Sequence, residues 1–416
     1  MIDPAAYRRR LLARLLQLAG AGTAGLAAVA AVDCGARSDL PGPTRSGGGA
    51  TSGTGGAGGA GGAGGGGGAG GSVLILADAS PATTGVTIGA GGGFPDGGLV
   101  SGMVCIPMVG KPSECPAVPV TIPGGAGICW MLVSVVSGPS VENNACCYEV
   151  VARSFPCYVG RTFFVDEGIV KAELRAGRSW RAGSVPEVSA MPAATRRALA
   201  EAWARDGLFE HASVASFSRF AMELLALGAP ADLVRDTHAA AVDEVRHAEL
   251  CLGLASAYFG ESVEPAALPV PGPLVIEANL ATVAAEAVME GCIGETVATV
   301  QALDALAAAT DPAVREVLEV TVADETRHAE LAWRFVAWAI DEGGAPVREA
   351  VQEAFAGFRP PVARVEDFEG VDLAIYAEHG RQRAVEGRAI AERAMTEILQ
   401  PAMCVLLSRG VRAERA

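Results

Sequence analysis

One octapeptide occurs twice in this chain, and it restricts the possible folds more than any other feature. Residues 243–250 read Asp-Glu-Val-Arg-His-Ala-Glu-Leu, and residues 324–331 read Asp-Glu-Thr-Arg-His-Ala-Glu-Leu. The copies differ at one position, and each lies in a long stretch rich in Ala, Leu, Glu and Arg with helical periodicity. Solvated charges on a helix rarely repeat this closely, so we infer an internal duplication of a helical hairpin.

Each copy contains a Glu-x-x-His motif, formed by Glu244 with His247 and by Glu325 with His328. Three residues turn an α-helix by about 300°, so both side chains of a motif leave one face, about one turn apart. A carboxylate and an imidazole placed in this way can bind one metal ion or bridge two. A single motif of this kind is more often a surface pair, but the second copy favours a metal site.

Each copy also carries an aspartate and an arginine beside the motif. Asp243 and Asp324 each precede a histidine by one helical turn and could orient an imidazole. Arg246 and Arg327 lie opposite the ligand face, so we expect them to make ion pairs between helices.

Four long helices are expected from the spacing of the apolar residues. They cover about 192–227, 231–258, 274–309 and 313–341. A proline-rich link, Gly260 to Pro273, joins the second helix to the third. When extended it spans about 46 Å, enough to cross a helix of about 28 residues, which is about 42 Å long. The tail, at 346–357 and 371–409, is also expected to be helical.

The remaining carboxylates of a four-helix site can be chosen from the positions of the turns. Residues of an antiparallel hairpin lie level with each other when they are equally far from its turn. Glu210 and Glu244 have their midpoint beside a Gly-Ala-Pro turn, and Glu295 and Glu325 have theirs within a Thr-Asp-Pro turn. Glu290 has its midpoint in an alanine run and lies about 140° around the helix from Glu295. We therefore expect Glu295 to be the ligand and keep Glu290 as a candidate that could swing in.

With these residues, the region from about 192 to 342 resembles the ferritin-like superfamily, nearest in pattern to rubrerythrin-type di-iron carboxylate proteins. The resemblance implies a ferritin-like four-helix bundle with a long crossover. For the whole chain we expect a mainly α fold, in which a small β-rich, cysteine-containing module precedes this bundle. It implies metal ligation by Glu210, Glu244, His247, Glu295, Glu325 and His328, with Glu290 as an additional candidate. Rubrerythrins usually carry a rubredoxin module with two Cys-x-x-Cys pairs, and this chain contains none.

Charge is distributed unevenly along the chain. Positions 1–190 include 13 Lys or Arg and 12 Asp or Glu, whereas positions 191–416 include 19 and 35 and carry a net charge of −16. This acidity argues against nucleic acid as a partner of the helical half. Bound cations would neutralise part of it.

Residues 1–34 have the pattern of an export segment. Three arginines, Arg8 to Arg10, precede an apolar run from Leu11 to Val32, and the pattern loosely resembles a twin-arginine signal. Cys34 stands where a lipoprotein cysteine would stand, but Asp33 before it does not fit that motif. A cleaved signal and an uncleaved membrane anchor both remain open. We expect an exported protein of the cell envelope or periplasm, with cytoplasmic residence as the less favoured alternative.

Short β-branched runs separated by Gly and Pro predict a small β-rich module before the helices. It contains six cysteines: Cys105, Cys115, Cys129, Cys146, Cys147 and Cys157. The adjacent pair Cys146-Cys147 suits disulfides better than a tetrahedral zinc site, although reduced buried thiols are the alternative. The predicted organisation is an export signal or anchor (1–34), a Gly-rich disordered linker (35–72), a cysteine-rich β module (73–185), the ferritin-like di-metal bundle (190–345) and a C-terminal helical extension (346–416).

Carboxylates with two imidazoles favour iron, or manganese, over zinc or copper. We therefore expect two iron ions and an oxidoreductase, peroxidase-like or ferroxidase-like, that acts on peroxide, O₂ or Fe(II). No electron-donor module is visible, so turnover requires an external electron donor. Two alternatives remain: a di-iron oxygenase with an organic substrate, which needs an apolar pocket beside the metal, and an exported metal-binding or structural protein without turnover. Oligomerisation is possible for each.

Overall fold

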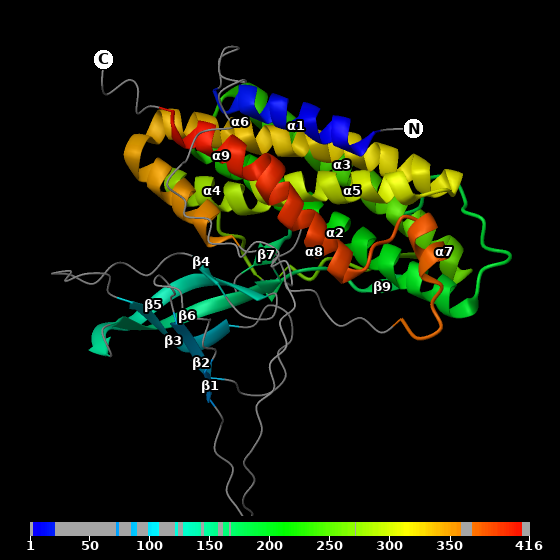
Figure 1. Cartoon of the computed structure of the whole chain (residues 1–416), viewed down its shortest axis with the longest axis horizontal. Coiled ribbons are helices and arrows are strands. Elements are labelled where there is room, and N and C mark those ends of the chain that lie inside the picture. The colour runs from blue at the N-terminus through cyan, green and yellow to red at the C-terminus, as the bar shows by residue number, and fades with distance from the viewer. Residues whose placement is uncertain are drawn as a thin grey trace, which may run out of the picture.

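The protein is mainly helical, with a smaller β region (Figure 1). The computed structural model describes residues 3–20, 161–165, 168–270, 272–358 and 368–409, and the strand backbones between 72 and 156. The predicted linker, apart from Ser72, and the predicted export segment beyond residue 20 lie outside these residues.

The long helices form two antiparallel pairs. In the first pair α2 (Ala193–Ala226) lies along α3 (Ala231–Phe259). In the second pair, α6 (Pro312–Gly357) lies along a continuous helical segment. That segment consists of α4 (Leu280–Ala287), the π-helix η2 (Val288–Glu295) and α5 (Thr296–Ala308). Contacts between α3 and α6 join the pairs.

The turns lie where glycine, proline and a capping side chain place them. Gly228 has a φ of +70°, which suits glycine, and it ends the first helix before Pro230. Asp311 caps α6, because its carboxylate accepts hydrogen bonds from the amides of Ala313 and Val314. These boundaries agree with the predicted turns.

Two predicted boundaries differ from the structure. The third helix begins at Leu280 rather than near 274, because Asn279 accepts hydrogen bonds from two amides of the first turn and acts as the N-cap. The fourth helix was expected to stop at Gly343-Gly344. The structure instead has a local break at Gly344, with φ +64° and ψ −138°, after which helix resumes to Gly357. Pro346 fits there because the first turn of a helix tolerates proline.

The N-terminal helix α1 (Pro4–Leu18) packs on α6, alongside which it runs in Figure 1, and on the C-terminal elements η3 (Met395–Leu399) and α9 (Gln400–Leu407). Leu11, Leu15 and Leu16 of α1 are buried. The Tyr7 hydroxyl lies 2.8 Å from the Thr326 hydroxyl of α6. The C-terminal helical elements are α7 (Leu373–Glu378), α8 (Ala384–Ala394), η3 (Met395–Leu399) and α9 (Gln400–Leu407). Among the described residues no helix has the length and apolar character needed to cross a membrane.

A six-stranded antiparallel sheet lies between α1 and α2 in the sequence, with the strand order β1-β2-β3-β6-β5-β4. Its strands are β1 (Ser72–Leu74), β2 (Gly85–Gly89), β3 (Leu99–Pro107), β4 (Thr121–Pro123), β5 (Ile128–Glu142) and β6 (Ala145–Pro156). Cys146 and Cys147 are buried on β6. The pairing of the six cysteines remains a prediction, because the side chains of Cys105, Cys115, Cys129 and Cys157 lie outside the described residues.

The segment between this sheet and α2 packs on the helices. It contains β7 (Phe164–Val165), β8 (Gly168–Ile169) and β9 (Leu174–Ala176). β9 pairs antiparallel with β10 (Val263–Pro265), which lies in the link between α3 and α4. The link that was expected to be extended is thus held as a strand near its start.

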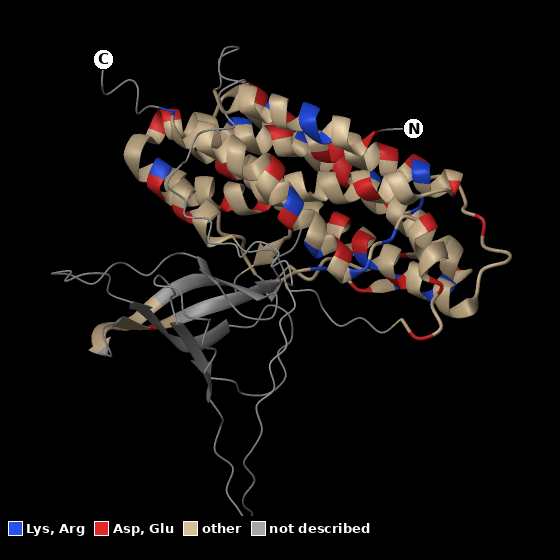
Figure 2. Ribbon diagram, in the orientation of Figure 1, with Lys and Arg blue, Asp and Glu red and all other residues tan. Residues whose placement is uncertain are grey.

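Two large apolar clusters lie along the length of the helices. One cluster contains residues near one end of the helix pairs, such as Leu199 of α2, Leu254 of α3 and Val317 of α6. The other cluster contains residues near the opposite end, such as Phe220 of α2 and Phe335 of α6. On all three helices the residues between these clusters include the Glu and His residues singled out from the sequence, so the candidate site is a polar layer between two apolar ones. Acidic residues are spread along the helices, with Lys or Arg residues among them (Figure 2).

Candidate metal centre

The structure brings all six predicted ligand residues together. Glu210 comes from α2, Glu244 and His247 from α3, Glu295 from the end of η2, and Glu325 and His328 from α6. Five of them are at most 4% exposed, and Glu210 is partly exposed. Each helical segment of the two pairs therefore contributes at least one carboxylate to a buried cluster.

The ligand atoms form two groups that share one carboxylate. Glu210, Glu244, His247 and Glu325 each offer an atom within 4.8 Å of the others, and so do Glu295, Glu325 and His328. His247 Nδ1 lies 3.4 Å from Glu325 Oε1, and His328 Nδ1 lies 3.4 Å from Glu325 Oε2. The two oxygens of Glu325 thus face the two imidazoles. Glu244 also approaches the second group, with its Oε1 3.1 Å from His328 Nδ1.

Four buried ligand atoms in this cluster make no hydrogen bond: His247 Nδ1, His328 Nδ1, Glu295 Oε1 and Glu325 Oε2. A buried polar atom without a partner is costly, by about 1–3 kcal/mol. All four atoms belong to metal-ligating group types and lie within the cluster. The residues therefore fit a pair of cations, which would satisfy these atoms.

The outer nitrogen of each imidazole faces an aspartate. His247 Nε2 lies 3.1 Å from Asp324 Oδ2, and His328 Nε2 lies 3.3 Å from Asp243 Oδ2. The arrangement is crossed, since each aspartate orients the histidine of the other octapeptide copy. Arg327 Nη2 lies 2.9 Å from Asp243 and 2.7 Å from Asp324, so it joins the two aspartates. This confirms the expected ion pair of Arg327 between helices.

Burial and crowding shift the ionisation of the cluster. Burial raises the pKa of Glu210 and of Glu295 well above the usual range, and the neighbouring carboxylates Glu244 and Glu325 raise them further. Burial also acts to raise the pKa of Glu325, but His328 and His247 outweigh it and hold the value at about 2. The pKa of His328 is raised, because the carboxylates around it outweigh the effect of burial. The cluster therefore favours bound positive charge, and metal cations would replace the protons held by its carboxyl and imidazole groups.

Glu290, the additional ligand candidate, lies outside both groups. Its carboxylate faces Arg161 Nη1 at 3.6 Å and Arg219 Nη2 at 3.9 Å. It belongs to the π-helix η2, whose wider turn ends at Glu295. Glu290 as a ligand thus remains a prediction that requires these ion pairs to open.

Two features of the site were not predicted from the sequence. The aspartates were expected to orient imidazoles, but not those of the other copy. Asp324 directly precedes Glu325, so their side chains leave the helix about 100° apart. This offset is the feature of the sequence that indicates an aspartate directed towards the neighbouring helix. The second feature is the position of Arg161 beside Glu290. It has no comparable signal, because it depends on how the segment before β7 packs against the helices.

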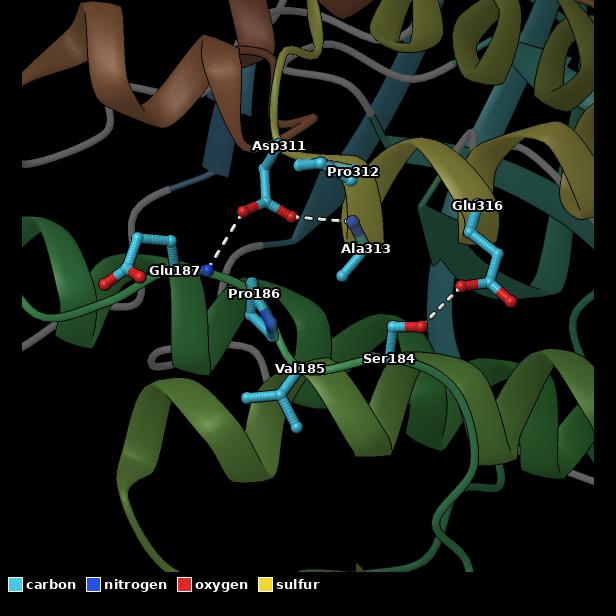
Figure 3. Close-up of a pocket in the computed structure, with 8 residues that line it drawn as sticks. All are labelled: Ser184, Val185, Pro186, Glu187, Asp311, Pro312, Ala313 and Glu316. Atoms are coloured by element: carbon cyan, nitrogen blue, oxygen red, sulfur yellow. Dashed lines mark hydrogen bonds between the residues drawn. The ribbon is translucent and has the colours of Figure 1, made fainter.

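A separate surface pocket of about 420 Å³ lies at the start of α6 (Figure 3). It is lined by Ser184–Glu187 and by Asp311, Pro312, Ala313 and Glu316, and it includes none of the six clustered residues. Its polar groups are largely paired with one another. Ser184 donates a hydrogen bond to Glu316, and the amide of Glu187 donates one to Asp311. The pocket therefore shows no chemistry comparable to that of the cluster.

No family model, curated protein or solved structure matches this chain.

Proposed function

We propose that residues 190–345 form a ferritin-like four-helix bundle that binds two metal ions, with iron favoured and manganese as the alternative. Two antiparallel helix pairs, joined through α3 and α6, support this class. So does a buried cluster to which every one of the four helical segments contributes a carboxylate.

One ion would be held by Glu210, Glu244, His247 and Glu325, and the other by Glu295, Glu325 and His328. The observation that carries this assignment is Glu325, whose two oxygens face the two imidazoles. Glu325 would therefore bridge the ions, and Glu244 would join it as a second bridge. Glu210 and Glu295 would be terminal ligands.

The donor set favours hard divalent cations. Four carboxylates balance the charge of two divalent ions, and oxygen-rich sites with two imidazoles suit iron or manganese better than copper or zinc. Two ferrous ions held there would supply two electrons to peroxide or O₂. The aspartates orient the imidazoles, and the apolar layers above and below limit the access of water. We therefore propose an oxidoreductase that reduces peroxide or O₂ with electrons from an external donor, or that oxidises Fe(II) as the donor itself.

Elemental analysis of the full chain, purified from its native compartment, tests the metal site. We expect about two metal ions per chain, mainly iron. The redox function is tested separately, by mixing the Fe(II)-loaded protein with hydrogen peroxide or O₂ and following the absorbance of ferric iron. A protein that contains two iron ions but reacts with neither oxidant would retain the site and lose the proposed activity. A protein that contains no metal would overturn both.

A further inference from the structure

A buried arginine from outside the helix pairs lies beside the metal centre. Arg161 precedes β7 and is 4% exposed. Its backbone carbonyl accepts a hydrogen bond of 2.7 Å from Ser213, which lies one turn after Glu210 on α2. This contact places the arginine between α2 and η2, next to the polar layer.

The guanidinium of Arg161 lies against two phenylalanine rings of α2. Its Cζ is 4.6 Å from the ring centre of Phe217 and 4.4 Å from that of Phe220. The Phe217 ring in turn packs edge-on against His328, with 5.1 Å between the ring centres. Arg161 is thus separated from a proposed metal ligand by one aromatic ring.

The guanidinium also meets η2. Its Nη1 faces Glu290 at 3.6 Å, and its Nη2 would lie 3.2 Å from a Cβ placed on Gly291. A Cβ there would first meet the Ala332 Cβ of α6, at 2.4 Å, so glycine at position 291 allows η2 to approach both α6 and the arginine. The Nε of Arg161 is buried without a hydrogen-bond partner. Burying a charge that is incompletely paired is unfavourable, so simple packing would be served better by an apolar side chain of similar volume.

We propose that Arg161 is a specificity-determining residue that fills the space beside Phe217 and admits only small oxidants, such as hydrogen peroxide or O₂, to the metal centre. This inference rests on the proposed function for the identity of the oxidant. The filled space is the one that an organic substrate of an oxygenase would require next to the metal. The positive charge of Arg161 and its pairing with Glu290 keep apolar molecules out of the space beside Phe217 and Phe220.

The first test uses metal-free, full-length protein, so that its result does not depend on the proposed activity. Arg161→Ala is combined with Glu290→Gln, because without Arg161 the Glu290 carboxylate would keep only its longer ion pair with Arg219. Arg161→Met with Glu290→Gln is the control, because methionine refills most of the space without charge. Benzene is the probe, since cavities lined by apolar side chains stay dry and bind it. Binding is measured by ligand-observed NMR, and helix content by circular dichroism.

We expect benzene to bind the Ala double variant at least about tenfold more tightly than it binds the wild type or the Met control. The proposal would be overturned if benzene bound the wild type as tightly as it binds the Ala double variant. It would also be overturned if a folded Ala double variant showed no gain in benzene affinity.

A second measurement needs no variant. The Fe(II)-loaded wild type should react with hydrogen peroxide and at least about a hundredfold more slowly with cumene hydroperoxide, which has the same O–O bond but a bulky apolar group. Similar rates would overturn the role of Arg161. A failure to react with either peroxide would count against the proposed function, and the benzene experiment would then still decide the role of Arg161.

Discussion

His247 Nε2 lies 3.1 Å from the carboxylate of Asp324, which belongs to the other copy of the octapeptide. The reverse pair, His328 with Asp243, has the same arrangement at 3.3 Å. Because each Nε2 faces an aspartate, each Nδ1 is directed into the carboxylate cluster. The duplicated sequence therefore forms one site in which each copy positions the ligand of the other.

Replacing Asp324 by asparagine should weaken metal binding. The amide keeps the shape of the side chain but removes the negative charge that supports His247, and changes of this kind typically lower metal affinity about 10–100-fold. Titration of the metal-free protein with Fe(II) against a competing chelator measures the effect. Asp341→Asn, on the exposed side of α6, is the control. Equal affinity in both variants would show that Asp324 does not support the ligand.

Arg327 and Arg246 occupy the same place in the two octapeptide copies, and Arg327 joins both aspartates. We expect Arg327→Met to lower Fe(II) affinity, but less than Asp324→Asn does, because Arg327 is half-exposed and its ion pairs are screened by water. Arg246→Met should leave the affinity unchanged. The same titration compares them, and an equal loss in both variants would contradict a specific role of Arg327.

Glu325 belongs to both ligand groups, whereas Glu210 belongs to one. Glu325→Gln should therefore leave less than about one bound metal ion per chain, and Glu210→Gln should leave about one. Elemental analysis after reconstitution with Fe(II) gives the stoichiometry. Glu353→Gln, at an exposed position of α6, should keep about two ions. If Glu325→Gln retained two, the carboxylate would not be shared.

His379 should make stability depend on pH. Its Nδ1 lies 2.7 Å from the buried Tyr258 hydroxyl, and burial lowers the pKa of His379 against the opposing effect of Asp311 and Glu378. The folded state thus favours the neutral imidazole. The neutral imidazole contributes fully to the free energy of unfolding above a pH of about 6.5, the ordinary pKa of histidine. This contribution is lost as the pH falls below that value.

His379→Gln tests this contribution by urea unfolding of metal-free protein at acidic and neutral pH. The variant should be less stable at neutral pH, by about 1 kcal/mol for the lost hydrogen bond, and the gap should narrow at acidic pH. The exposed His238→Gln is the control. A gap of constant size would show that His379 does not titrate differently on folding.

Leu15 anchors the N-terminal helix, since its side chain is fully buried against the helical body. Leu15→Ala should reduce the free energy of unfolding by about 2–5 kcal/mol, while Gln17→Ala at an exposed position should change it little. Urea unfolding measures both. A small effect of Leu15→Ala would mean that α1 is dispensable for the fold.

Export remains a prediction. The intact mass of protein from its native compartment shows whether α1 is retained.

Helix boundaries are predictable from the sequence where local chemistry decides them. The turns near Gly228 and Asp311 follow from a left-handed glycine and a capping carboxylate, and these signals lie within a few residues of the boundary. The prediction was wrong at the start of the third helix, where the composition of 274–279 is compatible with helix but Asn279 provides the cap.

Which residues could form the site can be read from the amino-acid order, because the repeated motif and the turn positions select six side chains by spacing alone. How these residues are supported depends on the fold. The crossed aspartate pairs require α3 and α6 to meet, and Arg161 reaches Phe217 because the segment before β7 folds against α2. Contacts between distant segments depend on packing in three dimensions, which local spacing along the chain does not encode.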